Sequence, residues 1–396
     1  MEPSLIDAPD SRLATPGPRI VIRGVNWLGD AVMTTPALQR LREAQPEAHL
    51  TLLTHEKLSD LWRGHPSLDA VLAFTPRESP WRVARRLREQ RFDIGLVLPN
   101  SPRSALELWL AGIPQRIGYR ARWRSWLLTH ALRPRPGAIR MRKRSPAEIR
   151  RLIQPPGSWT ATPFLSAAHQ MREYLRLVAA LGANPEPVAP RVSVSEREVE
   201  VIGRKFEVLT PEGRPRLLFG LNGGAEYGPA KRWPAERFVA TAVQVQHRAD
   251  CRWLIFGGAR DRDAATHIAR EIERAAGAGK TSATAGLTLN LAGATSLREL
   301  CVLLRLCRVL LTNDTGPMHV AAAVGTPVVA LFGSTSPELT GPGLPADPRH
   351  RLLCAGVPCA PCFRRQCPID FRCMNSLTVE QAVEAVLAVS GIPAGS

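Results

Sequence analysis

The sequence predicts an α/β fold of two successive domains, each a parallel sheet covered by helices on both faces. Short apolar runs alternate twice with helical patterns, which is typical of parallel sheets buried on both faces. A Gly- and Pro-rich stretch, residues 181–190, separates the two series and is the best candidate linker. The length of 396 residues exceeds what one hydrophobic core usually supports.

The first series follows a proline-containing arm. A strand over residues 19–23 runs into a Gly-containing loop and then into an apolar-periodic helix over 31–44. Short hydrophobic runs predict further strands at 50–53, 70–74 and 93–98, with a helical pattern at 81–90. A helix over 170–181 ends in the linker.

The second series repeats the alternation after the linker. It predicts strands at 216–221, 253–257, 287–291, 309–312 and 328–332, and helices near 235–246, 264–276, 297–306, 318–324 and 378–390. Ligands of open α/β sheets bind outside the carboxyl ends of the strands. The loops after residues 23, 98, 221, 257, 312 and 332 are therefore the expected site.

Composition and charge narrow the class of protein. With 44% hydrophobic and 22% charged residues the chain is expected to be globular, not disordered. Its longest nearly uncharged apolar run, residues 320–332, is shorter than the roughly 20 residues of a membrane span. The start of the chain carries Glu2, Asp7 and Asp10, so we expect no signal peptide and a cytoplasmic location.

The net charge of +17 is unevenly distributed. Residues 77–151 hold 18 arginines and one lysine against five acids, a net charge of +14. Such a basic segment indicates a polyanionic partner: nucleic acid, an anionic membrane surface or a phosphorylated substrate. A solvated arginine-rich surface is the alternative.

Two loops of the second series have the composition of a phosphate site. Asp314, Thr315 and Gly316 follow a strand and open a helix that carries His319, where backbone N–H groups and the helix dipole favour an anion. Asp314 or Thr315 as a simple N-cap is the alternative. In residues 223–234, glycines precede Lys231, which is either a point charge for a phosphate or part of a solvated Lys-Arg pair.

In the first series, Asp30 stands where the helix after the first strand begins. It is either a general base for a hydroxyl or an N-cap acid, and a helix N-terminus lowers a carboxyl pKa unless burial counteracts it.

Other signals are weaker. Residues 277–281 resemble the end of a P-loop but follow a helix and lack the first glycine. Asp261 and Asp263 form a D-x-D pair that fits a solvated helix start better than a metal site, although Asp261 remains a ligand candidate. Five cysteines in C-x4-C-x2-C-x4-C-x5-C spacing include only one CxxC pair, Cys359 and Cys362, so reduced or redox-exchangeable thiols are favoured over a metal. Metal binding or disulfides at Cys354, Cys359, Cys362, Cys367 and Cys373 stay open.

Five ordered motifs together resemble glycosyltransferase family 9, the ADP-heptose:lipopolysaccharide heptosyltransferases, and most closely its heptosyltransferase II group. They are residues 26–33 (NWLGDAVM), 100–105 (NSPRSA), 111–119 (AGIPQRIGY), 224–234 (GAEYGPAKRWP) and 312–322 (TNDTGPMHVAA). Two features depart from the family: Asn222 and Gly223 precede Gly224 where a proline is usual, and the cysteine-rich segment occurs in only some members.

The resemblance implies a GT-B architecture, two Rossmann-like domains facing across a cleft. We expect a disordered arm over residues 1–18, an acceptor-binding domain over 19–185 and a nucleotide-sugar-binding domain over 191–376. A C-terminal helix and tail, 377–396, are expected to return toward the N-terminal domain.

The same resemblance implies an inverting transfer of L-glycero-D-manno-heptose from ADP-heptose to the heptosylated Kdo–lipid A inner core, without a metal or other cofactor. Asp30 matches the catalytic base. The expected donor-binding residues are Glu226, Lys231, Asp261, Asp314, Thr315, Gly316 and His319. The expected acceptor-binding residues are Asn26, Gly29, Asn100, Ser101, Arg103, Arg116 and Arg120.

The implied partners are ADP-heptose, the anionic lipopolysaccharide acceptor and, by peripheral contact, the cytoplasmic face of the inner membrane. Nucleic acid is not expected as a partner. Transfer of another nucleotide sugar, or to another glycan, is the alternative; a basic nucleic-acid-binding protein is a more distant one.

Overall fold

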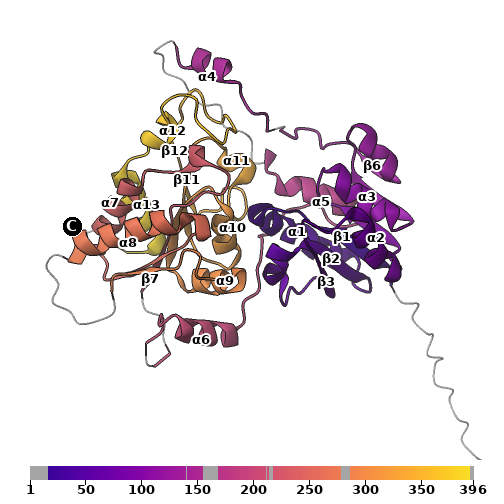
Figure 1. Cartoon of the computed structure of the whole chain (residues 1–396), viewed down its shortest axis with the longest axis horizontal. Helices are drawn as coiled ribbons and strands as arrows, with labels where there is room; N and C mark the ends of the chain where they lie inside the picture. Colours follow the sequence, from indigo (N-terminus) through magenta and orange to yellow (C-terminus); the bar gives the residue numbers. More distant parts are fainter. Residues whose placement is uncertain are drawn as a thin grey trace, which may run out of the picture.

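Two parallel sheets of six strands each form the framework of this computed structural model (Figure 1). The structure describes residues 17–139, 141–154, 168–210, 212–213, 217–277 and 286–392. Residues 1–16 of the expected arm, 393–396 of the expected tail and most of the P-loop-like segment lie outside the described residues. Within those ranges, no helix is both long and apolar enough to cross a bilayer.

The N-terminal sheet has the strand order β3-β2-β1-β4-β5-β6. Its strands are β1 (Arg19–Arg23), β2 (His49–His55), β3 (Ala70–Phe74), β4 (Ile94–Val97), β5 (Gln115–Tyr119) and β6 (His130–Leu132). Because β1 lies between β2 and β4, the strand order reverses there, and in such sheets ligands bind beyond the carboxyl ends of the strands at this point.

The C-terminal sheet has the order β12-β11-β10-β7-β8-β9. Its strands are β7 (Leu218–Asn222), β8 (Arg252–Ile255), β9 (Thr288–Asn290), β10 (Val309–Asn313), β11 (Val328–Phe332) and β12 (Arg351–Cys354). Here the order reverses between β7 and β10, again at the first strand of the domain. The predicted pair of doubly wound domains is confirmed.

Helices connect the strands. In the N-terminal part they are α1 (Leu28–Ala44), α2 (Pro80–Glu89), α3 (Pro102–Leu110), α4 (Pro146–Leu152) and the 3₁₀ helices η1 (Glu56–Trp62) and η2 (Arg122–Leu127). In the chain, α5 (Met171–Ala179) and α6 (Glu196–Lys205) come between the strands of the two sheets. The C-terminal part has α7 (Ala235–Gln246), α8 (Arg262–Gly277), α9 (Leu297–Leu306), α10 (Gly316–Ala323), α11 (Pro337–Thr340), α12 (Arg372–Asn375), α13 (Val379–Ser390), η4 (Pro229–Lys231) and η5 (Ala259–Asp261).

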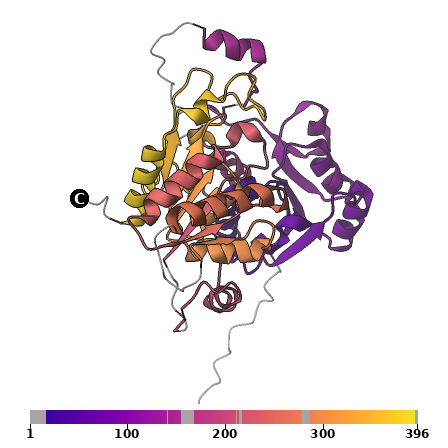
Figure 2. The same ribbon diagram turned by 60° about the vertical axis from the view of Figure 1, so that its left-hand side comes forward.

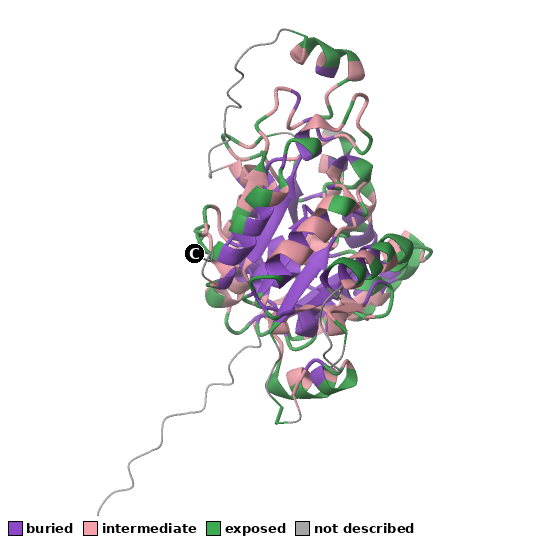
Figure 3. Cartoon of the chain, turned by 90° about the vertical axis from the view of Figure 1, so that its left-hand side faces the viewer, coloured by how far each residue is buried: buried purple, intermediate pink, exposed green. Residues whose placement is uncertain are grey.

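The apolar core has three main layers. The largest cluster is continuous between the two sheets, because α1 packs against both α5 and α10, and η1 packs against α9. The outer face of the N-terminal sheet is covered by α2 and α3, and that of the C-terminal sheet by α7, α8 and α13. Figure 3 shows buried strands between helices whose outer faces are exposed.

Two segments lie elsewhere than expected. The C-terminal helix α13 packs on α7, β10, β11 and β12 of its own sheet, so the expectation that it returns to the N-terminal domain is wrong. Its apolar residues are buried in the outer layer of the C-terminal core, and burying them against the N-terminal domain would expose that layer to water. The segment that crosses is α4, whose Ile149 packs against Cys359 and Cys362. Figures 1 and 2 both show α4 above the C-terminal domain.

Most predicted elements appear with ends shifted by a few residues, and 19–23, 70–74, 235–246, 297–306 and 328–332 match as predicted. The strands β5, β6 and β12 and the helices α3, α4 and α6 were not predicted. The strand β5 (QRIGY) lacks an apolar run, and it forms because β4 and β6 pair with it on either side. Cross-strand pairing thus overrides its weak strand pattern.

Candidate active site

Asp30 lies in the first turn of α1, beyond the carboxyl end of β1. Trp27 holds the N-cap position and no side chain caps the helix, so Asp30 is not the N-cap residue. Burial disfavours the charged carboxylate and raises the pKa of Asp30 from 3.8 to about 6, although Lys231 and a Gln170 N–H partly oppose this shift. A carboxyl group with this pKa is ionised at neutral pH yet basic enough to accept a proton.

Gln170 holds the Asp30 carboxylate from the segment that precedes α5. Its Nε2 lies 3.4 Å from Asp30 Oδ1 and donates at 2.9 Å to the hydroxyl of the buried Tyr174. Its backbone N–H donates to Leu339 O, 2.9 Å away in the C-terminal domain. The sequence does not single out Gln170 as a site residue. Its place at the start of a helix gives no indication that its side chain contacts a carboxylate in a distant part of the chain.

Lys231 and Asp314 form a buried ion pair beside Asp30. Lys231 Nζ lies 2.5 Å from Asp314 Oδ2, and the two side chains are only 13% and 5% exposed. Thr335 Oγ1 donates to the same carboxylate oxygen at 2.5 Å, and the ammonium lies 4.9 Å from the Tyr227 ring centroid. The burial argues against a solvated lysine, and the pair holds the ammonium in one place.

The start of α10 lies at the carboxyl end of β10. Thr315 is its N-cap residue, but the hydroxyl makes no cap bond and instead accepts a hydrogen bond of 2.9 Å from Asn222 Nδ2 at the end of β7. Asn313 bonds to Gly223 O and Trp233 N, which ties the two loops together. The first N–H groups of a helix lack intrahelical partners, so this end of α10 can bind an anion.

Two glycines allow α1 and α10 to cross closely. A Cβ on Gly29 would lie 2.7 Å from His319 Cδ2, and one on Gly316 would lie 2.9 Å from Leu28 Cβ. His319 is buried, and desolvation lowers its pKa to about 4, so it packs there as a neutral imidazole at pH 7. The contact brings the Asp30 and Lys231 loops together.

Asp261 and Glu226 lie further out. Asp261 Oδ2 accepts a hydrogen bond from Gly258 N at 3.0 Å, and a Cβ on Gly224 would lie 2.6 Å from the Asp261 carboxyl carbon. Asp261 therefore packs against the loop of Lys231 only because residue 224 is glycine. Glu226 is exposed, and its Oε1 lies 4.0 Å from Lys57 Nζ across the domain boundary.

The expected acceptor residues lie in different surroundings. Arg103 pairs with the fully buried Glu107 at 2.8 Å, and Arg116 donates to Leu127 O at 2.8 Å, so both guanidinium groups bind within their own domain. Ser101 caps α3. Asn26, Asn100 and Arg120 are exposed on loops after β1, β4 and β5, and Gly29 lies at the α1–α10 crossing.

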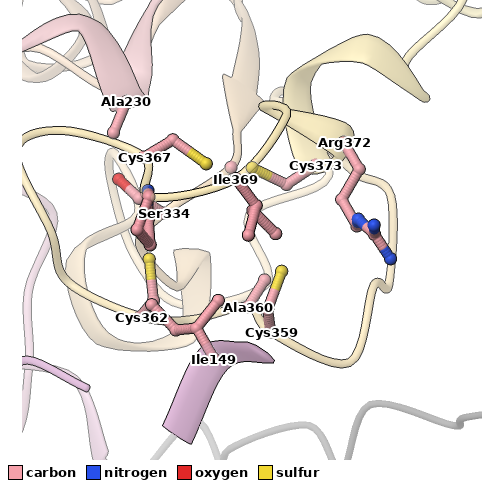
Figure 4. A pocket seen from close by; sticks show the side chains of 12 residues that line it. Ile149, Ala230, Ser334, Cys359, Ala360, Cys362, Cys367, Ile369, Arg372 and Cys373 are labelled. Carbon is pink, nitrogen blue, oxygen red and sulfur yellow. The ribbon is translucent and has the colours of Figure 1, made fainter. Parts of the chain in front are cut away.

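Four of the clustered cysteines line one small pocket, together with Ile149 of α4 (Figure 4). Cys359, Cys362, Cys367 and Cys373 are free thiols, and burial raises the pKa of Cys373 to about 12. No group of three or more Cys, His, Asp or Glu side chains is arranged for a metal ion in the part of the chain that the structure describes. The cysteine-containing loop holds the segment before Lys231 in place, since Arg365 O accepts a hydrogen bond from Ala230 N and Phe363 O accepts one from the Tyr227 hydroxyl.

Comparisons with known proteins agree with this geometry. The model of glycosyltransferase family 9 (heptosyltransferase) matches residues 80–145 and 157–371. Lipopolysaccharide heptosyltransferase 2 of Salmonella typhimurium is 30% identical, over 82% of this chain and 85% of its own length. The Escherichia coli enzyme of that name is 29% identical over the same shares.

Solved structures give the same result. The structure of E. coli ADP-heptose lipopolysaccharide heptosyltransferase II superimposes with a TM-score of 0.71 and 26% identity, covering 94% of this chain and 98% of that one. A glycosyltransferase family 9 structure from Veillonella parvula reaches a TM-score of 0.70 at 23% identity, covering 94% and 97%. The latter likeness shows the shared fold alone.

Proposed function

The chain belongs to glycosyltransferase family 9, and we propose that it transfers heptose from ADP-heptose to the inner core of lipopolysaccharide. It is a glycosyltransferase with two α/β domains, each built on a parallel sheet. Two of its relatives are named lipopolysaccharide heptosyltransferase 2. The observation that carries the proposal is the half-buried Asp30 carboxyl, whose pKa desolvation raises to about 6, beside the Lys231–Asp314 pair. A base, the Asp30 carboxylate, and a cation able to bind phosphate, the Lys231 ammonium, thus lie close together where the two domains meet.

The chemistry is a single displacement at the anomeric carbon of the heptose. Asp30 accepts the proton of the acceptor hydroxyl while its oxygen forms the new bond to that carbon. The bond from the carbon to the β-phosphate oxygen breaks on the opposite face, and ADP leaves with the electron pair. Inversion follows from this geometry.

Charge that develops on the departing β-phosphate is stabilised by fixed donors. Lys231 carries three N–H protons, of which the pairing with Asp314 uses only part, so an N–H remains for a phosphate oxygen. The free N–H groups at the start of α10 supply further donors. Asp314 acts as a positioning residue, because it holds the ammonium through the same carboxylate oxygen that Thr335 binds.

The acceptor side is the N-terminal domain, with the exposed Asn26, Asn100 and Arg120 at the carboxyl ends of its strands. An inner-core acceptor bears anionic groups on a lipid anchor, which fits the basic segment of residues 77–151. We therefore place the enzyme at the cytoplasmic face of the inner membrane, in peripheral contact with it. Arg103 and Arg116 would hold the loops of this surface in place through their hydrogen bonds to backbone carbonyls of the same domain.

The test is product analysis with purified protein. ADP-heptose and a heptosylated Kdo–lipid A acceptor should give stoichiometric ADP and an acceptor one heptose heavier. Asp30→Asn serves as the inactive control and Asp263→Asn, an exposed carboxylate on α8, as the matched active one. ADP release with a different nucleotide sugar, and none with ADP-heptose, would overturn the proposed donor.

A further inference from the structure

Exposed tryptophans gather at one edge of the N-terminal domain. Trp81 is 69% exposed in the first turn of α2, and Trp123 and Trp126 are 60% and 86% exposed on η2. Residues three apart on a 3₁₀ helix lie on the same side, so the two indoles of η2 share one face. Large apolar side chains exposed together mark an interaction surface.

Two arginines link the segments that carry these tryptophans. Arg103, at the start of α3, donates to Glu78 O in the loop before Trp81. Arg124, buried on η2, donates at 2.9 Å to Pro99 O in the loop before α3. The start of α2, the start of α3 and η2 are therefore adjacent, and both sets of indoles flank the same helix start.

The edge is also positively charged. Arg77, Arg82 and Arg120 are exposed, and among the described residues no ion pair engages them. The nearest acids are already used: Glu78 pairs with Arg86 at 3.1 Å, and Glu107 is fully buried between Arg23 and Arg103. The indoles are thus bordered by exposed arginines that no ion pair among the described residues neutralises.

The same edge holds the start of the catalytic helix. Elements α1, α2, α3 and η2 each follow the carboxyl end of a strand of one parallel sheet, and these ends lie at a common edge. The exposed Trp109 does not belong to this group of tryptophans, because it lies in the last turn of α3, toward the opposite edge of the sheet. A surface that bound at Trp81 and Trp126 would face the side on which Asp30 lies.

We propose that Arg77, Trp81, Arg82, Arg120, Trp123 and Trp126, here named the Trp–Arg edge, dock the enzyme on an anionic lipid bilayer. The proposal rests on the proposed function, since it explains how a lipid-anchored acceptor reaches Asp30. Indole rings settle at the boundary between head groups and acyl chains, and arginines beside them bind lipid phosphates. A soluble polyanion would satisfy the arginines but leave the indoles in water.

The experiment is cosedimentation with vesicles of equal parts phosphatidylglycerol and phosphatidylcholine, without any sugar substrate. The wild-type protein should bind these vesicles and bind pure phosphatidylcholine at least tenfold more weakly, with salt weakening the first interaction. Trp123→Ala/Trp126→Ala and, separately, Arg77→Glu/Arg82→Glu should each lower vesicle binding at least tenfold. Trp109→Ala and Arg197→Glu, exposed residues away from this edge, are the matched controls.

Activity separates this proposal from the proposed function. With a deacylated, water-soluble acceptor both double variants should release ADP at the wild-type rate, whereas with vesicle-embedded acceptor their KM should rise. Wild-type vesicle binding by both double variants, or an equal loss in Trp109→Ala, would overturn the docking edge. Absence of heptose transfer by the wild type to either acceptor would overturn the function instead, while the vesicle result would stand by itself.

Discussion

Replacing Asp30 by asparagine keeps the size of the side chain but removes the group that accepts a proton. Turnover should fall by roughly 10²–10⁴, the usual contribution of a positioned general base. The affinity for ADP-heptose should change by no more than a few-fold, because the proposed donor contacts lie in the C-terminal domain. In the wild type, kcat/KM should rise with pH through about 6, where Asp30 ionises. The variant should lack this rise.

The same substitution should stabilise the fold at neutral and higher pH. The pKa of Asp30 is about 6 in the folded chain against an ordinary 3.8, so between these values the folded state binds more protons than the unfolded one. The free energy of unfolding of the wild type therefore falls as pH rises through this window, by about 3 kcal/mol in total. Asparagine carries no charge and avoids this loss.

The assays are initial rates of ADP release across pH and urea unfolding near pH 4 and near pH 8. Asp30→Asn should exceed the wild type by up to about 3 kcal/mol near pH 8 and by less than about 1 kcal/mol near pH 4. Asp263→Asn should match the wild type in every measurement. Near-normal turnover of Asp30→Asn would refute its role as the base, and equal stability at both pH values would refute its burial.

Three further substitutions test the surroundings of Asp30. Lys231→Ala should weaken ADP binding by about 1.5–3 kcal/mol, the range for a hydrogen bond to a charged group; equal affinity in calorimetry would place the ammonium away from the nucleotide. Gln170→Leu removes an N–H that favours the Asp30 carboxylate, so the rise of kcat/KM should move to higher pH; an unmoved pH profile with lower thermal stability would leave Gln170 a purely structural role. Gly29→Ala adds a Cβ 2.7 Å from the buried His319 and should lower the free energy of unfolding by about 1–3 kcal/mol; an unchanged melting temperature would mean that the α1–α10 crossing yields easily.

Many of the residues around the candidate site could be predicted from the sequence for a simple geometric reason. Strands that run parallel end at one edge of their sheet, so polar loops that follow successive strands converge there. This is why Asp30, after β1, and Asp314, after β10, could be identified as candidates before any distance was known. The alternation of apolar runs likewise predicted both sheets, because strands buried on both faces need continuous apolar sequence.

Tertiary structure decided what each polar side chain meets. Arg103, Arg116 and Arg120 are indistinguishable in a basic sequence, yet the first two are partly buried and donate to acceptors of their own domain, whereas Arg120 is exposed. Gln170 meets Asp30 from 140 positions along the chain, a contact that no local pattern encodes. The pKa of Asp30 depends on the burial created where two domains meet. Sequence determines periodicity and loop chemistry because these are local, whereas partners, burial and charge environment arise only when distant segments pack together.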